Sequence, residues 1–139
     1  MKPFIILFFL SFTCLVFSQS GTYKREPKHT DGTKIKWTLK LKEDGSFLYH
    51  FLRDLSTISK ENKEENFYGK GTWKHEGNQI LFYSKPSDLN AEFSVNLNNS
   101  KARYITKSPR DKSDKIVKTA LRFYESDTFH IEGLTVFKE

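Results

Sequence analysis

Histidine, cysteine and serine are the side chains best suited to metal binding or nucleophilic catalysis, and their spacing here matches neither chemistry. The chain holds four histidines, His29, His50, His75 and His130, and one cysteine, Cys14. Their separations do not match those of zinc-binding motifs, and no Gly-x-Ser-x-Gly nucleophile elbow occurs. We therefore expect no metal site and no cofactor.

Paired carboxylates are the next chemistry to consider, because a glycosidase needs two of them roughly 5–10 Å apart in different environments. Glu64 and Glu65 lie in a strongly charged segment that is typical of a solvated surface, and Glu43 and Asp44 precede a glycine that indicates a turn. No glycine-rich phosphate loop occurs. We expect that the chain is not an enzyme. A hydrolase stays a third hypothesis, and it would require a cleft in which a histidine meets a carboxylate.

Aromatic side chains are the best candidates for a binding function, since they make up 15% of the residues. On predicted strands they either fill the core or line a pocket, and an eight-stranded barrel is just wide enough for one or the other. Both interpretations stay open. The candidate lining residues are Trp37, Tyr49, Phe51, Trp73, Phe82, Phe93 and Tyr104.

A row of lysines marks the clearest predicted strand, over residues 34–42. Apolar and basic residues alternate there, which places them on opposite faces of a strand. A basic row either keeps the surface soluble or contacts an anionic envelope component or glycan. We expect no nucleic-acid partner, because Trp37 lies on the opposite face from the basic side chains. The row consists of Lys34, Lys36, Lys40 and Lys42.

Alternation and turn residues predict strands throughout the remaining chain. Glycine-containing turns are expected at 31–32, 43–45 and 76–78, and a weaker turn at 126–127. The polar connections 54–66 and 107–115 are interpreted as solvated linkers, and the first has room for a short helix. Segments 46–53 and 79–84 are apolar on both faces, so their inward face stays unassigned. The further predicted strands are 46–53, 67–75, 79–84, 91–97, 102–106, 116–124, 128–131 and 134–137.

This pattern predicts an all-β fold, an antiparallel meander of about 8–10 strands that closes into a barrel and so removes exposed edges. A β-sandwich is the alternative.

The first 18 residues have the features of a secretory signal peptide. Lys2 precedes an apolar run that ends at Ser18, and that run is shorter than the ~20 residues that span a bilayer. We expect cleavage after Ser18, with cleavage after Ser20 as the alternative; lipidation of Cys14 is disfavoured because the sequence stays apolar beyond it. Residues 19–139 then form one exported domain, periplasmic or extracellular, without cysteine.

Short motifs resemble those of bacterial lipocalin-like secreted proteins. Gly21-Thr22-Tyr23 is similar to the first-strand Gly-x-Trp of lipocalins, with tyrosine in place of tryptophan, and Gly69-x-Gly71-Thr72-Trp73 followed by Gln79-Ile80-Leu81-Phe82 is similar to a hairpin of these families. The resemblance implies a calyx-shaped barrel that holds a small apolar ligand, with no catalytic residues. It also implies that Arg122 lies over the first-strand aromatic.

Two function classes follow from these observations. The first is a non-catalytic exported binding protein, a monomer, that holds a small, partly apolar ligand inside the barrel. The alternative is a cell-envelope interaction module that acts through its basic outer surface around a fully packed core.

Overall fold

The structure is a computed structural model that describes residues 19–55, 64–128 and 130–139. The expected signal peptide, residues 1–18, and positions 56–63 of the first polar connection lie outside the described residues. Within the described part, no helix has the length and apolar character needed to cross a membrane. The elements are β1 (Gly21–Arg25), β2 (Lys34–Leu41), β3 (Ser46–Asp54), β4 (Glu64–Glu76), β5 (Gln79–Tyr83), the 3-10 helix η1 (Pro86–Asp88), β6 (Lys101–Ile105), β7 (Ala120–Glu125) and β8 (Thr135–Lys138).

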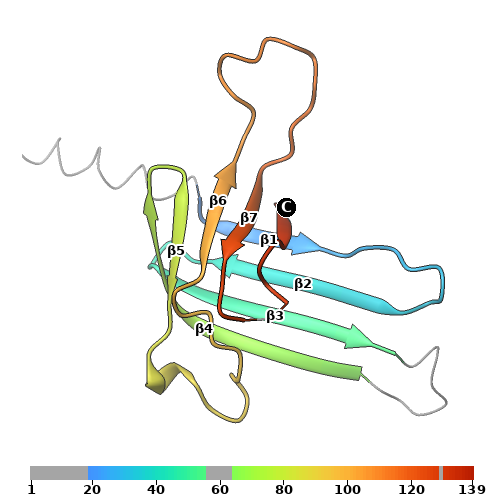
Figure 1. Cartoon of the computed structure of the whole chain (residues 1–139), viewed down its shortest axis with the longest axis vertical. Helices are drawn as coiled ribbons and strands as arrows, with labels where there is room; N and C mark the ends of the chain where they lie inside the picture. The colour runs from blue at the N-terminus through green and yellow to red at the C-terminus, as the bar shows by residue number, and fades with distance from the viewer. Residues whose placement is uncertain (1–18, 56–63, 129) are drawn as a thin grey trace, which may run out of the picture.

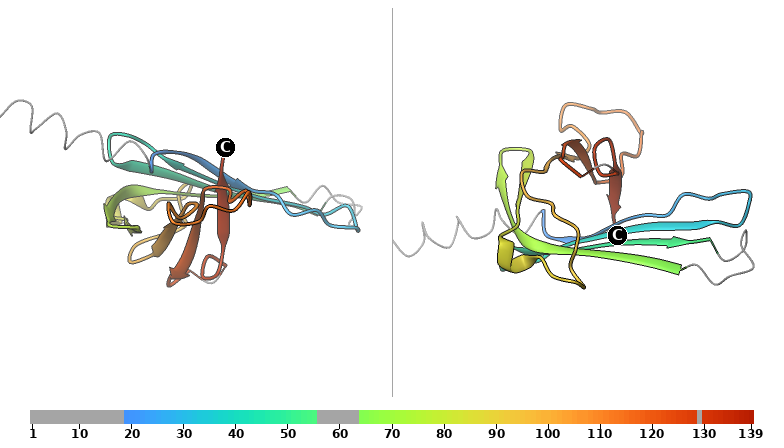
Figure 2. Two further views of the ribbon diagram at one scale, coloured as in Figure 1. Left: turned by 90° about the horizontal axis from the view of Figure 1, so that it is seen from above. Right: turned by 60° about the horizontal axis from the view of Figure 1, so that its bottom comes forward.

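The strands form a closed antiparallel barrel. Each strand pairs with its neighbour in the chain, and β8 returns to pair with β1. The predicted all-β meander and its closure are therefore confirmed, and the sandwich alternative is not. Strands β1 to β4 lie side by side as a long sheet, and β5, β6 and β7 stand across one end of it (Figures 1 and 2).

The alternating pattern sets which side chains enter the barrel. Leu39 and Leu41 of β2 are buried, whereas Lys40 between them is exposed. In β3, Phe47, Tyr49 and Phe51 point inward, because the register places them opposite Leu41, Leu39 and Trp37 of β2. This assigns the inward face of the segment that is apolar on both sides. The inward residues of β5 are Ile80 and Phe82.

Two glycines make the tight β2–β3 and β4–β5 connections. Gly45 has a φ of 87°, and Gly77 a φ of 59°, a region that favours glycine. Next to the first turn, the Asp44 carboxylate accepts hydrogen bonds from the backbone N–H and the hydroxyl of Ser46. These bonds lower the pKa of the Asp44 carboxyl. Both predicted hairpin turns are confirmed.

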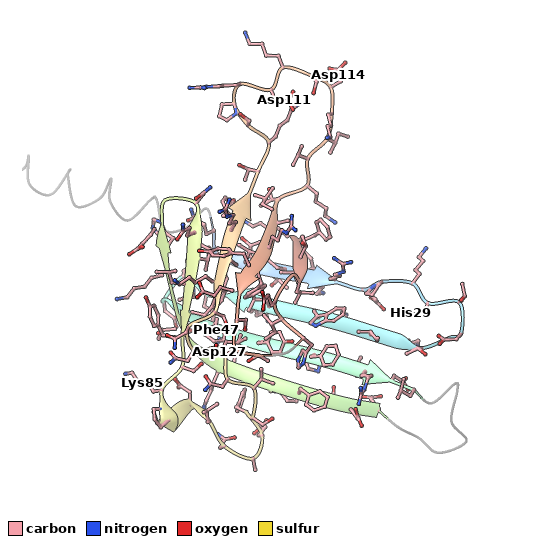
Figure 3. All side chains as sticks on the ribbon, in the orientation of Figure 1. His29, Phe47, Lys85, Asp111, Asp114 and Asp127 are labelled. Carbon is pink, nitrogen blue, oxygen red and sulfur yellow. The ribbon has the colours of Figure 1, made fainter. Side chains whose placement is uncertain are left out.

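The core is densely packed where β5 to β7 cross the sheet. The Phe82 ring lies 5.2 Å from Phe47 and 5.3 Å from Phe123, measured between centroids, and all three side chains are fully buried. Figure 3 shows Phe47 in this crossing region. Gly71 permits the packing, because a Cβ at that position would lie 2.1 Å from the Tyr83 carbonyl oxygen. This part of the interior is filled by side chains.

Three expected strands differ from the structure. Residues 91–97 form no strand, although Val95 and Leu97 are buried as their alternation predicts. Val95 donates one backbone hydrogen bond, to the Tyr68 carbonyl, and the segment covers an edge of β4 that β5 does not pair with. Residues 128, 130 and 131 lie in a bend and a turn, and residues 116–119 precede β7 without joining it.

Candidate functional site

Aromatic side chains gather on the inner face of β2, β3 and β4, away from the Gly45 turn. Trp37, Phe51 and Phe67 occupy successive positions across the three strands, because Trp37 pairs with Phe51 and Phe51 pairs with Phe67. Their ring centroids are 5.1 Å and 5.8 Å apart. The ring of His130, from the turn before β8, stacks on Phe51 at 5.1 Å. We call these four residues the aromatic cluster.

The aromatic cluster is only partly covered. Phe51 is buried, whereas Trp37 and Phe67 are half-buried and His130 is exposed. Large aromatic side chains normally contribute most of their stabilisation when they are fully buried. A row of half-buried rings around one buried ring therefore leaves apolar surface available to a ligand.

Two buried polar atoms in this region have no hydrogen-bond partner. They are the hydroxyl oxygen of Tyr49, a residue that is 2% exposed, and the indole Nε1 of Trp37. Burial raises the pKa of the Tyr49 phenol, and the neighbouring Trp37 N–H opposes that rise without forming a hydrogen bond of ordinary geometry. An unpaired buried polar group costs about 1–3 kcal/mol.

The other amphipathic aromatics of the core are satisfied. The Tyr23 hydroxyl donates to the Gln19 carbonyl at 2.6 Å, and Trp73 Nε1 donates to the Lys42 carbonyl at 3.0 Å. The fold therefore supplies partners for buried Tyr and Trp groups elsewhere, and Tyr49 and Trp37 depart from this pattern.

A charged pair borders the aromatic cluster. Arg53 of β3 donates from Nε and Nη2 to the Glu65 carboxylate of β4, directly opposite in register. Although much of the His130 residue is exposed, partial desolvation of its ring lowers the pKa of His130, and the nearby positive charge of Arg53 adds to the effect. The neutral imidazole is thus favoured, and it stacks on Phe51 without bringing a second positive charge next to the guanidinium.

The structure brings together only part of the predicted lining set. Trp37, Tyr49 and Phe51 converge at the aromatic cluster. Trp73 and Phe82 point inward but belong to the densely packed region, and Tyr104 packs partly buried against the core. Phe67 and His130 were not among the predicted lining residues. The period-two spacing of Phe67, Gly69 and Gly71 places Phe67 on the inward face and could have identified it. His130 lies in a turn, where no such spacing exists.

Phe93 and Arg122 do not line the interior. Arg122 is exposed between the buried Leu121 and Phe123, so its side chain points outward and does not cover Tyr23. Phe93 belongs to the segment that crosses the edge of β4, and its ring contacts Tyr68 and lies 4.7 Å from Lys70 Nζ, on the outer face. The expected inward placement of both is wrong.

The lysine row lies on the outer face of β2, as predicted. Lys34, Lys40 and the following Lys42 are exposed, and Lys36 is half-buried. Aromatics share this face on neighbouring strands: His50 of β3 and Tyr68 of β4 stack at 4.6 Å with nearly parallel rings. They border a hollow of about 320 Å³. Its remaining lining comes from Thr38, Lys40, Leu48, Tyr49, Glu92 and Phe93.

Within the described residues, no group of three His, Cys, Asp or Glu side chains is placed to hold a metal ion. Comparison with protein-family models, curated proteins and solved structures gives no match to this chain.

Proposed function

We propose that the chain is an exported, non-catalytic binding protein that holds a small, largely apolar ligand against the aromatic cluster. One observation carries the proposal: the buried Tyr49 hydroxyl and the Trp37 indole N–H have no hydrogen-bond partner, and Trp37 belongs to a cluster of partly exposed aromatic rings. Both groups can donate a hydrogen bond. The complementary ligand has a flat apolar body and one oxygen acceptor, such as a carbonyl.

The apolar body would cover the exposed parts of Trp37 and Phe67, and the acceptor would reach the buried donors. Burial of apolar area supplies most of the affinity, at about 25 cal/mol per Å². The single polar contact supplies orientation, in the usual manner of sites that combine many apolar contacts with few polar ones. The signal peptide predicted over residues 1–18 supports export.

Native mass spectrometry of protein made through a secretory route, followed by organic extraction, tests whether a ligand co-purifies. A matched pair of probes then tests the site: 2-acetylnaphthalene, which carries a carbonyl, and 2-ethylnaphthalene, which does not. The chain has two tryptophans, so the Trp73 indole N–H in the packed core is an internal control for NMR.

We expect the Trp37 indole signal to shift on titration with 2-acetylnaphthalene while the Trp73 signal stays in place. The acetyl probe should bind about three- to tenfold more tightly than the ethyl probe, the worth of one neutral buried hydrogen bond. The Tyr49→Phe variant should shrink that ratio. Equal shifts of both indole signals, or equal affinity for both probes, would contradict the assigned site.

The outer face supports a second candidate function, binding of an anionic glycan of the cell envelope. The hollow between Phe93 and the His50–Tyr68 stack has apolar ring walls and Lys40 on its border. Lys36 on β2 and Lys70 on β4 add positive charge to the same face. Charge reversal at Lys36 and Lys40 should abolish retention on an acidic polysaccharide, and unchanged retention would exclude this candidate.

A further inference from the structure

Two arginines face each other across β6 and β7 on the outside of the barrel. Arg103 of β6 and Arg122 of β7 are direct cross-strand partners, and both are exposed. Like charges at directly opposed positions destabilise a sheet. The next outward pair along the same strands is complementary, because Lys101 forms a salt bridge of 3.3 Å with Glu125. The two arginines therefore repel each other, whereas Lys101 and Glu125 attract each other.

A β-bulge places an aromatic ring beside this pair. The register changes between Lys101, opposite Glu125, and Ala102, opposite Phe123, so Tyr124 is the extra residue. Bulges redirect side chains and are frequent next to functional sites. The Arg103 guanidinium lies 5.4 Å from the Tyr124 ring centroid, and this stacking holds its planar group in place.

The two arginines and Tyr124 line a hollow of about 370 Å³. Glu132 and Gly133, from the turn before β8, and Phe123 complete the lining. Within the described part of the chain, Glu132 forms no salt bridge with either guanidinium. Two positively charged groups with ten N–H donors between them therefore border one concave surface.

We propose that this hollow binds a phosphate group, free or as a phosphomonoester. A guanidinium matches two oxygens of a phosphate in a bidentate manner, and the charge of nearly −2 on a phosphomonoester at neutral pH matches two arginines. A carboxylate has one negative charge and two oxygens, enough for a single guanidinium. Binding of the phosphate also removes the repulsion between Arg103 and Arg122. The site is separate from the aromatic cluster and does not depend on it.

The test uses the whole mature protein at constant ionic strength, with inorganic phosphate as the probe and arginine side-chain NMR signals as the readout. Arg103→Gln and Arg122→Gln should each weaken binding by about tenfold or more, as expected for a charge-assisted hydrogen-bonded pair. Arg122→Lys keeps the charge but loses the bidentate geometry, so it should also weaken binding. Glu132→Gln should strengthen binding, because it removes a negative charge from the lining.

Arg110→Gln is the matched control, since it removes the same charge from the exposed loop between β6 and β7. If it weakens binding as much as Arg122→Gln, the interaction is diffuse electrostatics and the proposal fails. It also fails if no arginine signal responds to phosphate. Glycerol phosphate and vesicles of phosphatidylcholine with phosphatidic acid separate the sources: tighter binding to the first indicates a soluble phosphomonoester, and tighter binding to the second indicates a lipid headgroup.

Discussion

Replacing Tyr49 with phenylalanine should leave the protein as stable as before or more stable. The side chain is 2% exposed, and its hydroxyl has no hydrogen-bond partner. Removal of one buried oxygen deletes an unsatisfied group whose burial costs about 1–3 kcal/mol, while the ring and its packing stay. Because the Trp37 N–H lies close enough to interact weakly with the phenol, we expect a gain of about 0–1 kcal/mol, below the full penalty.

Tyr23→Phe is the matched control. Tyr23 is also buried, but its hydroxyl donates to the Gln19 carbonyl at 2.6 Å. Loss of that hydroxyl leaves a buried acceptor without its donor, and the free energy of unfolding should fall by about 1–2 kcal/mol. The two variants delete the same atom from the same barrel interior, so their difference isolates the hydrogen bond.

Urea denaturation followed by far-UV circular dichroism gives both free energies of unfolding. The slopes should stay equal, since neither change alters the surface exposed on unfolding. We expect Tyr49→Phe to be about 2 kcal/mol more stable than Tyr23→Phe. If both variants lose the same stability, the Tyr49 hydroxyl is satisfied in the folded protein, and the argument for a free polar donor next to Trp37 is refuted.

Two further predictions concern the core. Burial raises the pKa of both Tyr23 and Tyr49, so above about pH 10 the unfolded chain loses these protons while the folded protein keeps them. The free energy of unfolding should therefore fall with rising pH, by about 1.4 kcal/mol per pH unit for each tyrosine. Urea denaturation at pH values from about 9 to 11.5 should show that either Phe variant makes this fall with pH less steep. Gly71→Ala should cost about 3 kcal/mol because its Cβ would clash with the Tyr83 carbonyl and the Phe47 ring. Gly77→Ala, where a Cβ meets no neighbour but φ is 59°, should cost about 1 kcal/mol; thermal unfolding compares the two, and equal losses would contradict the steric explanation.

The barrel fold could be predicted from the sequence because most strands have one face that is polar and exposed to solvent. The lysines of β2 identify its outer side, and the turns at Gly45 and Gly77 join neighbouring strands. The same rule could not orient β3, whose outward Leu48 and Leu52 are as apolar as its inward residues. In the structure these leucines lie opposite Lys40 and Lys36 in register, and they are only half-buried.

Alternation reports burial, and it does not by itself report strand pairing. Residues 91–97 alternate as a strand would, and their buried positions follow the pattern. Their backbone nevertheless lies across the edge of β4 with one hydrogen bond from Val95. The part of the β4 edge that residues 91–97 can cover depends on where the β4–β5 pairing ends. The sequence of residues 91–97 alone does not contain that information.

The site was harder to predict than the fold, because it depends on register across three strands. Trp37, Phe51 and Phe67 meet only because the β2–β3 and β3–β4 pairings align them. For Arg122 the sequence pattern was the better guide. Its inward placement was predicted from a family resemblance, whereas the apolar neighbours Leu121 and Phe123, which are buried in the structure, indicate an outward side chain.

The distribution of unsatisfied polar atoms separates two parts of the barrel. Among the described residues, the buried side-chain atoms without a partner belong to Thr33, just before β2, to Trp37 in the middle of β2, and to Tyr49 of β3, opposite Leu39. Where β5 to β7 cross the sheet, Trp73 is hydrogen-bonded and Gly71 permits close packing. Natural proteins pair nearly all buried polar groups, and exceptions are concentrated at functional sites. A barrel that needed the aromatic cluster only as core would gain stability from phenylalanine at position 49, so the unpaired Tyr49 hydroxyl supports the proposal that a ligand supplies its partner.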